Sequence, residues 1–135
     1  MRTIIAGSRK IPEKQALNAI YYCPWWEEIT KVLSGTCQGP DIAGEKFAAR
    51  EMIEAEHYSP DWGKYPGCAG PIRNQHMVNE ADAAIIIWDG KSKGTRDLIT
   101  KAKRKKLKMW IYYTNPEWWE KNEIREIPGK TREVI

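Results

Sequence analysis

The stretch that decides the fold is Ala-Ala-Ile-Ile-Ile-Trp (AAIIIW, residues 83–88), followed at once by Asp-Gly-Lys-Ser-Lys-Gly-Thr (DGKSKGT, residues 89–95). Six consecutive apolar residues are typical of a strand that is covered on both faces of a sheet. A glycine-containing loop and then a helical pattern over 95–106 come next, as in a unit that alternates strand and helix. This stretch therefore predicts a parallel sheet inside an α/β domain.

The rest of the chain repeats this alternation of strand and helix. Four more short apolar runs predict strands at 2–6, 29–33, 55–59 and 108–113. Three further helices are expected, at 13–22, 41–52 and 71–81. Asp41 is a plausible N-cap of its helix, because its side chain can accept a bond from a free N–H of the first turn. We expect residues 1–113 to form a single Rossmann-like three-layer α/β domain with a mainly parallel five-stranded sheet.

Residues 114–135 lie outside this unit and form a short C-terminal extension. The segment EIREIPGKTREVI (123–135) alternates polar and apolar residues around a Pro-Gly pair, which favours a hairpin. An isolated hairpin needs something to pack on. The extension is therefore expected to serve as a hairpin, as a lid over a ligand or as a subunit contact, and the sequence leaves these three open.

Composition narrows the class of protein. Of the 135 residues, 41% are apolar and 30% charged, which is ordinary for a globular domain and excludes a disordered chain. No apolar run reaches about 18 residues, so no membrane span is expected, and the first residues show no secretory leader. The three cysteines show no metal-ligand spacing and cannot all pair. We expect a cytoplasmic protein.

Charge and aromatic residues are distributed unevenly. Residues 91–108 carry nine of the 22 Lys and Arg residues against one Asp. Such a basic stretch is compatible with nucleic-acid binding, but it is also typical of the solvated face of a helix. The chain has seven Trp, and the pairs Trp25-Trp26 and Trp118-Trp119 suit a contact between subunits. A homo-oligomer is therefore expected.

Three glycine loops follow predicted strands and precede predicted helices: residues 7–9 (GSR), 34–41 (SGTCQGPD) and 89–95. The carboxyl ends of parallel strands share one edge of a sheet, so these loops should meet there. Glycine allows close backbone approach, and helix starts attract anions. Together they predict a phosphate-bearing ligand, although neither a P-loop nor a GxGxxG fingerprint is present.

Four segments occur in a recognisable order: IIAGSR (4–9), SGTCQGPDIAGE (34–45), PDWGKYPGCAGPIRN (60–74) and WDGKSKGT (88–95). Together they resemble the SLOG superfamily of Rossmann-like nucleotide-binding domains. The most similar branch is that of the small YspA-like, YpsA-related proteins found in phages and in bacterial conflict loci. The resemblance covers residues 1–113 and implies a nucleotide-derived ligand at the carboxyl edge of the sheet.

The resemblance also implies which residues contact that ligand. The positions that match the family's motifs are Gly7, Ser8, Arg9, Ser34, Gly35, Gly39, Asp41, Arg73, Asn74, Asp89, Gly90, Ser92, Gly94 and Thr95. No metal site and no required cofactor are implied, and the use of Mg²⁺ stays open.

The chemistry of these residues gives each a candidate role. The backbones at Gly7-Ser8 and Gly94-Thr95 and the hydroxyls of Ser92 and Thr95 are expected to hold phosphates. Arg9 and Arg73 are expected to pair with phosphate. The carboxylates that suit ribose hydroxyls are Asp41, Glu45 and Asp89, and the rings that suit a base are Trp62, Tyr65 and Trp88. The structural alternatives are that Asp41 only caps its helix and that Trp88 belongs to the core.

Relatives in the superfamily include enzymes, the lonely-guy phosphoribohydrolases, whose loop reads PGGxGTxxE with a catalytic glutamate. Here Leu98 stands at the position of that glutamate, and Asp97 is rotated by about 100° on the helix. The expected function is therefore binding of an ADP-ribose-like or cyclic nucleotide without turnover, by a phage protein that sequesters a bacterial immune signal in the host cytoplasm. The alternatives are a nucleotide hydrolase and a DNA-binding protein similar to DprA.

Overall fold

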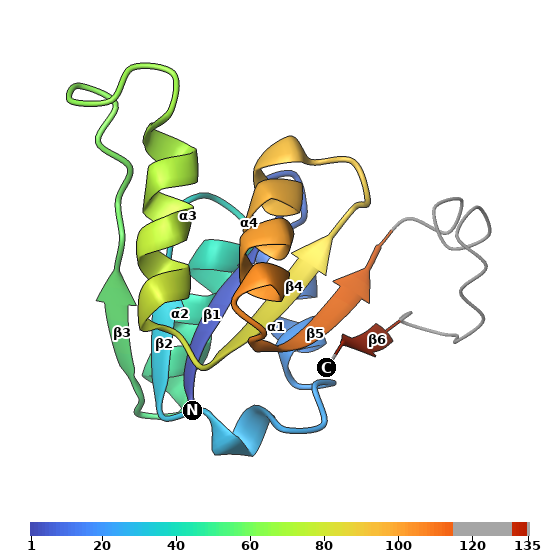
Figure 1. Ribbon diagram of the computed structural model, residues 1–135. Coiled ribbons are helices and arrows are strands. Elements are labelled where there is room, and N and C mark those ends of the chain that lie inside the picture. Colours follow the sequence, from blue (N-terminus) through green and yellow to red (C-terminus); the bar gives the residue numbers. More distant parts are fainter. Residues whose placement is uncertain (115–130, 135) are drawn as a thin grey trace.

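The computed structural model describes residues 1–114 and 131–134. Figure 1 shows one sheet with helices packed against it. Its strands are β1 (Arg2–Gly7), β2 (Lys31–Ser34), β3 (Glu54–His57), β4 (Ala83–Trp88), β5 (Lys108–Tyr113) and β6 (Thr131–Val134). The helices are α1 (Glu13–Ile20), the short 3₁₀ helix η1 (Trp26–Glu28), α2 (Pro40–Arg50), α3 (Ala69–Glu80) and α4 (Lys93–Arg104).

The strand order is β3-β2-β1-β4-β5-β6. The five strands from β3 to β5 are all parallel, so the predicted Rossmann-like α/β fold is confirmed. The chain winds outward from β1 to β3 and then returns to place β4 on the other side of β1. β6 adds a sixth strand, antiparallel to β5. The expected partner of β6 in a hairpin, residues 123–127, lies outside the described residues, as does Trp118-Trp119.

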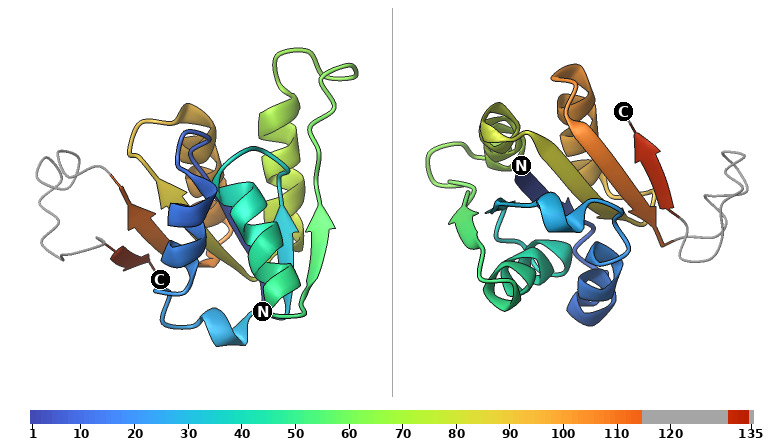
Figure 2. Two further views of the ribbon diagram at one scale, coloured as in Figure 1. Left: turned by 180° about the vertical axis from the view of Figure 1, so that it is seen from behind. Right: turned by 90° about the horizontal axis from the view of Figure 1, so that it is seen from below.

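Helices cover both faces of the sheet (Figure 2). α1 and α2 cover one face, and α3 and α4 cover the other. The strands alternate accordingly, since Ile4 of β1 packs on the α3–α4 side while the next residue, Ile5, packs on the α1–α2 side. β4 is buried along its whole length, as a continuous apolar run requires when both faces are covered.

One local prediction is wrong, and a second loses part of its support. Asp41 is not the N-cap of α2, because Gly39 occupies that position with a φ of 78° and Asp41 lies within the first turn. The Trp25-Trp26 pair does not form an outward apolar contact. Trp25 is buried in the protein's own core, and Trp26 packs edge-on against Tyr21 with ring centroids 5.0 Å apart. The homo-oligomer stays a prediction without this support.

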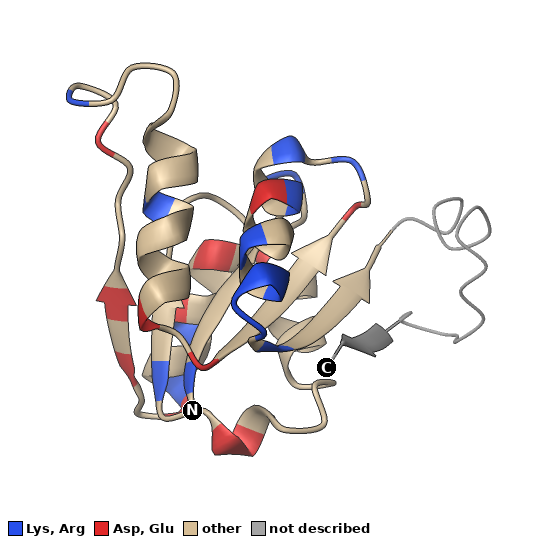
Figure 3. Ribbon diagram, in the orientation of Figure 1, with Lys and Arg blue, Asp and Glu red and all other residues tan. Residues whose placement is uncertain are grey.

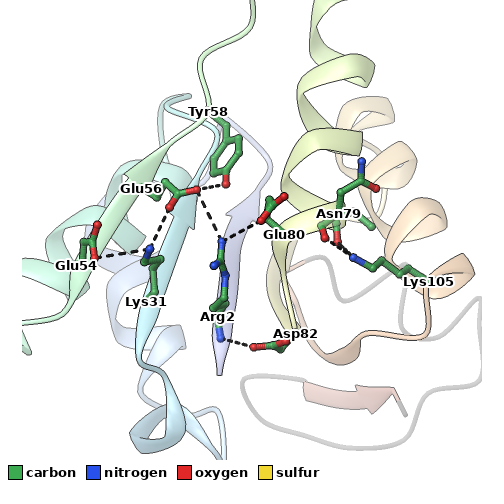
Figure 4. A network of polar contacts seen from close by, with 10 residues as sticks. Arg2, Lys31, Glu54, Glu56, Tyr58, Asn79, Glu80, Asp82 and Lys105 are labelled. Atoms are coloured by element: carbon green, nitrogen blue, oxygen red, sulfur yellow. Dashed lines mark hydrogen bonds and ion pairs between the residues drawn. The ribbon is translucent and has the colours of Figure 1, made fainter.

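Charged side chains gather near the amino ends of the strands (Figure 4). Lys31 of β2 pairs with Glu56 of β3 at 3.1 Å, and Arg2 of β1 reaches Glu80 at the end of α3 at 3.4 Å. Partly exposed pairs of this kind contribute little stability. Lys105, which follows α4, donates its ammonium to Val78 O at 2.9 Å and to the neighbouring carbonyl of α3. This lysine therefore ties the end of α3 to the end of α4.

Gly7 shows why a glycine is needed where β1 meets β4. A Cβ at this position would lie 1.8 Å from Ile87 O and 2.9 Å from the ring of Pro40. Neither neighbour is the free end of a flexible side chain, so the sheet itself would have to open. We expect Gly7→Ala to lower the free energy of unfolding by about 3 kcal/mol or more, measured by chemical denaturation.

Gly63 supplies the control for this prediction, since a Cβ there meets only Asp61 Oδ1 at an ordinary 3.5 Å. The free energy of unfolding of Gly63→Ala should lie within about 0.5 kcal/mol of that of the original protein. Equal losses in the two variants would mean that the close approach of β1 and β4 does not explain Gly7.

Candidate functional site

The candidate site lies at the carboxyl edge of the sheet, where β1 and β4 are neighbours although they are far apart in sequence. This is the point at which the winding direction changes, and it is where open α/β sheets bind ligands. Two adjoining pockets open here. The smaller one, the inner pocket, has a volume of about 70 Å³. Its lining residues are Ala6, Gly7, Arg9, Cys37, Asp41, Arg73, Asn74, Met77, Ser92, Gly94, Thr95 and Leu98.

The larger one, the outer pocket, has a volume of about 500 Å³, within the range of about 300–1,000 Å³ that small-molecule sites occupy. It is lined by Ser8, Arg9, Lys10, Asp89, Lys91, Ser92 and Gly94. Arg9, Ser92 and Gly94 line both pockets, so the two form one continuous site. Its outer end carries the exposed cations Arg9, Lys10 and Lys91, a set that attracts anions.

The N-terminus of α4 opens into both pockets. Its N-cap residue, Ser92, makes no capping bond with its side chain; instead its hydroxyl accepts a bond from the Thr95 hydroxyl at 3.1 Å. The first turn of α4 has no acidic residue. The backbone N–H groups of a first turn have no acceptor within their own helix. Here they face a pocket, which is an arrangement suited to an anion.

Asp89 organises the loop that leads into α4. Its Oδ1 accepts bonds from the backbone N–H groups of Lys91 at 2.8 Å and Ser92 at 2.9 Å, and its own N–H donates to Ser8 Oγ at 3.1 Å. Burial alone would raise the pKa of Asp89, but these hydrogen bonds outweigh it and hold the pKa below its usual value. The carboxylate therefore shapes the loop through Oδ1, and Asp89 also lines the outer pocket.

Arg73 brings a positive charge to the inner pocket. Its Nη1 donates to Gly35 O at 2.5 Å, and its Nε donates to Asn74 Oδ1 at 2.9 Å. Among residues 1–114, no carboxylate lies within 4 Å of its guanidinium nitrogens, although its charge acts on the nearby buried carboxyl of Asp41. The side chain is thus held in place by neutral acceptors, and its charge is shared between Asp41 and the cavity.

Asn74 connects α3 to α4 beside this arginine. It is buried, and its Nδ2 donates to Gly94 O at 3.3 Å and to Asp97 Oδ2 at 3.0 Å. Asp97 is also held by Lys101, 2.7 Å away. Since Arg73 reaches the loop after β2 and Asn74 reaches α4, two adjacent residues of α3 join the walls of the inner pocket.

Asp41 is a buried carboxyl group in the inner pocket, with only 4% of the residue exposed. Its Oδ2 accepts a weak bond from the N–H of Cys37 at 3.4 Å. Removal from water raises its pKa to about 6, although the charge of Arg73 and hydrogen bonds from Cys37 and Gly7 act in the opposite direction. Near neutral pH this group therefore both holds and releases a proton.

The glycines of the loop after β2 serve close packing. A Cβ on Gly35 would lie 2.6 Å from Asp41 Oδ2 and 2.7 Å from Arg73 Nη1, so glycine leaves the space in which these two groups approach. Gly39 has the positive φ of a residue for which glycine is preferred, and a Cβ there would lie 2.7 Å from Ile11 O. Both glycines therefore allow the close packing that shapes the site, without lining either pocket themselves.

Ser34 and Glu45 lie outside both pockets. The Ser34 hydroxyl donates to Glu45 Oε2 at 2.6 Å, and Glu45 Oε1 lies 2.9 Å from His57 Nε2. The hydroxyl of Ser34 also accepts the N–H of Thr36 at 3.1 Å. Both oxygens of Glu45 are thus engaged within the protein, and the pair supports the loop after β2 instead of lining the cavity.

The predicted aromatic residues separate into an exposed and a buried group. Trp62 is 49% exposed and lies outside both pockets, with its ring 3.8 Å from where a Cβ on Gly70 would stand, next to Arg73. Tyr65 also lies outside both pockets. Trp88 is only 6% exposed and packs in the core at 5.9 Å from the Tyr113 ring. Its indole N–H donates to Ser92 O at 3.3 Å, so Trp88 supports the loop before α4.

Several lining residues were not predicted from the sequence. Cys37, Met77 and Ala6 belong to the inner pocket, and Lys10 and Lys91 to the outer one. Lys10 directly follows the predicted loop 7–9, and Lys91 lies within the predicted loop 89–95, so both could have been predicted from their positions in the sequence. Leu98 lines the inner pocket, where the hydrolase loop has its glutamate. Gly90, which has a φ of 82°, belongs to the loop between Asp89 and Lys91 but does not line either pocket.

No match was found when the chain was compared with protein-family models, with curated proteins and with solved structures. Within residues 1–114 and 131–134, no three His, Cys, Asp or Glu side chains gather into a possible metal site. None of the helices in these ranges has both the length and the apolar character that a membrane crossing requires.

The buried carboxyl of Asp41 makes stability depend on pH. Its pKa is higher in the folded than in the unfolded chain, so the folded chain binds more protons between about pH 4 and 6, and stability falls as pH rises through this window. Asp41→Asn removes this contribution. The free energy of unfolding of the variant, taken relative to that of the original protein, should rise by up to about 3 kcal/mol from pH 4 to pH 7. Denaturant unfolding at each pH measures it.

The sign of the trend is the decisive part of this prediction. The free energy of unfolding of Asp41→Asn minus that of the original protein should rise with pH. If this difference stays constant from pH 4 to 7, or falls as pH rises, the carboxyl group is not desolvated in the folded protein.

Proposed function

We propose that this chain binds a nucleotide-derived small molecule, such as an ADP-ribose-like or cyclic nucleotide, and holds it without turnover. The observation that carries the proposal is the guanidinium of Arg73 in the inner pocket, which neutral acceptors hold without a direct ion pair among residues 1–114. It shares one continuous cavity with Arg9 and with the first turn of α4, which contains no acidic residue. Two arginines and a helix N-terminus around one cavity suit a phosphorylated ligand.

The parts of such a ligand fit the site in a definite order. Phosphates are best held where Arg9, Lys10 and Lys91 surround the outer pocket and the first turn of α4 opens into it. A sugar hydroxyl suits the carboxyl of Asp41 in the inner pocket, the smaller of the two. The half-exposed ring of Trp62 stands beside Arg73 and offers a face on which a base can stack.

Binding without turnover is supported by what lines the inner pocket. Leu98 presents an apolar side chain at the position of the hydrolase glutamate, and Asp97 is engaged with Asn74 and Lys101. A group that neither donates nor accepts protons cannot act as a general acid or base. The biological role that we propose on this basis is sequestration, by a phage protein in the bacterial cytoplasm, of a nucleotide signal used in immunity. We retain homo-oligomer formation as part of the proposal.

A second candidate function, hydrolysis of a nucleotide, is favoured by one observation. Asp41 is desolvated, lines the inner pocket and has a pKa of about 6, which is suited to a general acid near neutral pH. In this alternative Asp41 donates a proton to the leaving base as the glycosidic bond breaks, and water adds to the sugar. The binding experiment below distinguishes the two functions.

Replacement of Arg73 should weaken ligand binding without unfolding the protein. Arg73→Ala removes one charge-assisted contact with phosphate, so we expect the affinity for ADP-ribose to fall about 10- to 100-fold. Isothermal titration calorimetry measures the affinity, and a thermal melt checks the fold. Arg50→Ala is the matched control, because Arg50 is exposed at the end of α2 and lines neither pocket.

Two results would contradict the proposal. Unchanged affinity in Arg73→Ala would place the ligand elsewhere. Release of free base or ribose phosphate during the titration, detected by mass spectrometry, would support the hydrolase instead; Asp41→Asn should then abolish the release.

Replacement of Gly94 should separate binding from stability. No atom lies within 4 Å of a Cβ placed there, and the residue lines both pockets in the first turn of α4. Since alanine favours a helix over glycine, Gly94→Ala should melt at the same temperature or higher. The added methyl group stands in open space at a residue that lines both pockets, so the affinity for ADP-ribose should fall at least about tenfold. A variant that binds as tightly as the original protein would show that the ligand does not approach α4.

A further inference from the structure

Lys and Arg recur along α4 (Figure 3), and several exposed ones form a row on one side of the helix. The row consists of Lys93, Arg96, Lys103 and Arg104, with Lys91 before the helix and Lys106 after it. Spacings of three, seven and one residues place the four helical members on one side of α4. We call this set the α4 strip. It contains no acidic residue, because Asp97 lies at its border and is engaged with Lys101 and Asn74.

Other cations of the same basic stretch are used inside the protein. Lys101 pairs with Asp97 and also donates to Pro71 O at 3.0 Å. Lys105 donates to the end of α3 at Val78 O. Lys108 lies over the Trp25 ring at 5.2 Å from its centroid. These lysines have structural contacts, whereas the members of the α4 strip are exposed, and among them Arg96 contacts Gly90 O and the Trp88 ring.

The electrostatics of the helix explain only part of the strip. Lys103 and Arg104 lie in the last turn of α4, where cations interact favourably with the helix dipole. Lys93 stands in the first turn, where a cation is unfavourable; the turn itself has no acidic residue, and the Asp89 carboxylate before it is bonded to the backbone N–H groups of Lys91 and Ser92. Arg96, one turn further on, is held near the loop before α4 by Gly90 O at 3.5 Å and by the Trp88 ring. Helix stability thus gives no reason for the positive charge at this end.

The strip continues directly from the phosphate-suited outer pocket. Lys91 belongs to both, and Lys93 is the neighbour of two pocket residues, Ser92 and Gly94. From there the strip follows the 12 residues of α4, a length of about 18 Å. A line of cations of this length, beginning at a cluster of cations, complements a chain of several phosphates better than a single anion.

We propose that the α4 strip binds the phosphate backbone of a single-stranded nucleic acid. Double helices are less suitable, because a helix that enters the major groove must protrude from its domain, and α4 lies side by side with α3 in one layer (Figures 1 and 2). The contacts are to phosphate, so they give affinity without reading sequence. This surface shares Lys91 with the outer pocket, but its far end at Lys103 and Arg104 lines neither pocket, and the proposal does not depend on the function proposed for the pocket.

The test is a titration of the full chain with 12-nucleotide single strands, oligo-dT and oligo-rA, followed by fluorescence anisotropy at 50–200 mM salt. In Lys103→Gln/Arg104→Gln, two phosphate contacts are lost at the end of the strip that is remote from the pocket. We expect at least about tenfold weaker binding at 50 mM salt, and a plot of log affinity against log salt that is shallower by about 1.4. The affinity for ADP-ribose should not change.

The matched control is Lys14→Gln/Lys46→Gln, which removes the same charge from exposed positions on α1 and α2, across the sheet. It should bind the strands within twofold of the original protein. An equal loss in both double variants would overturn the proposal, since net charge alone would explain the binding. Failure of the original protein to bind either strand at 50 mM salt would also overturn it.

A third arm tests for an acidic protein partner. Poly-glutamate of matched charge is added as a competitor, and at equal charge concentration it should displace less than a tenth of the strand. Full displacement would assign the α4 strip to an acidic polypeptide and contradict the proposal. If the two single strands bind equally well, the contact is to the shared phosphodiester backbone, as proposed; binding of one alone would mean that the bases or sugars are read instead.

Discussion

The parallel pairing of β1 with β4 is the constraint on which the rest of the structure depends. Residues 3–7 pair with residues 83–87, so segments about 80 positions apart in sequence become neighbours in the centre of the sheet. The pairing is close enough at Gly7 to exclude any side chain. It brings the loop after β1 and the loop after β4 to the same point, and Ser8 joins them through Ile87 O and the N–H of Asp89. The cavity exists because these two strands end together.

Around this point, polar groups are used in two different ways. Asp89, Ser34 and Glu45 have their oxygens engaged by neighbouring residues and give the loops their shape. Arg73 and the first turn of α4 keep donors directed at the cavity. A sequence motif does not distinguish residues that shape a loop from residues that contact a ligand, because both kinds are part of the same motif.

Much of the fold could be predicted from the sequence, and less of the site. The apolar run 83–88 and the alternation of strands and helices were sufficient for the five parallel strands, since they depend on local pattern. The place of the cavity followed from the rule for parallel sheets. The burial of Trp88 agrees with its place in the apolar run 83–88, whereas the position of Asp41 inside α2 could not be predicted, because it depends on the conformation of Gly39. Contributions from Met77 and Cys37 likewise require the crossing of α3 with the loop after β2.

The two helices that form one wall of the cavity are fastened at both ends. Near the cavity, Asn74 and Lys101 join α3 to α4, and at the far end Lys105 holds the last carbonyls of α3. These contacts oppose any separation of α3 from α4, so the width of the cavity varies little. An incoming ligand meets groups that are already in place, and less conformational entropy is lost on association than in a site that must close around its guest. For the ligand that we propose, such a site favours retention through a slow rate of departure.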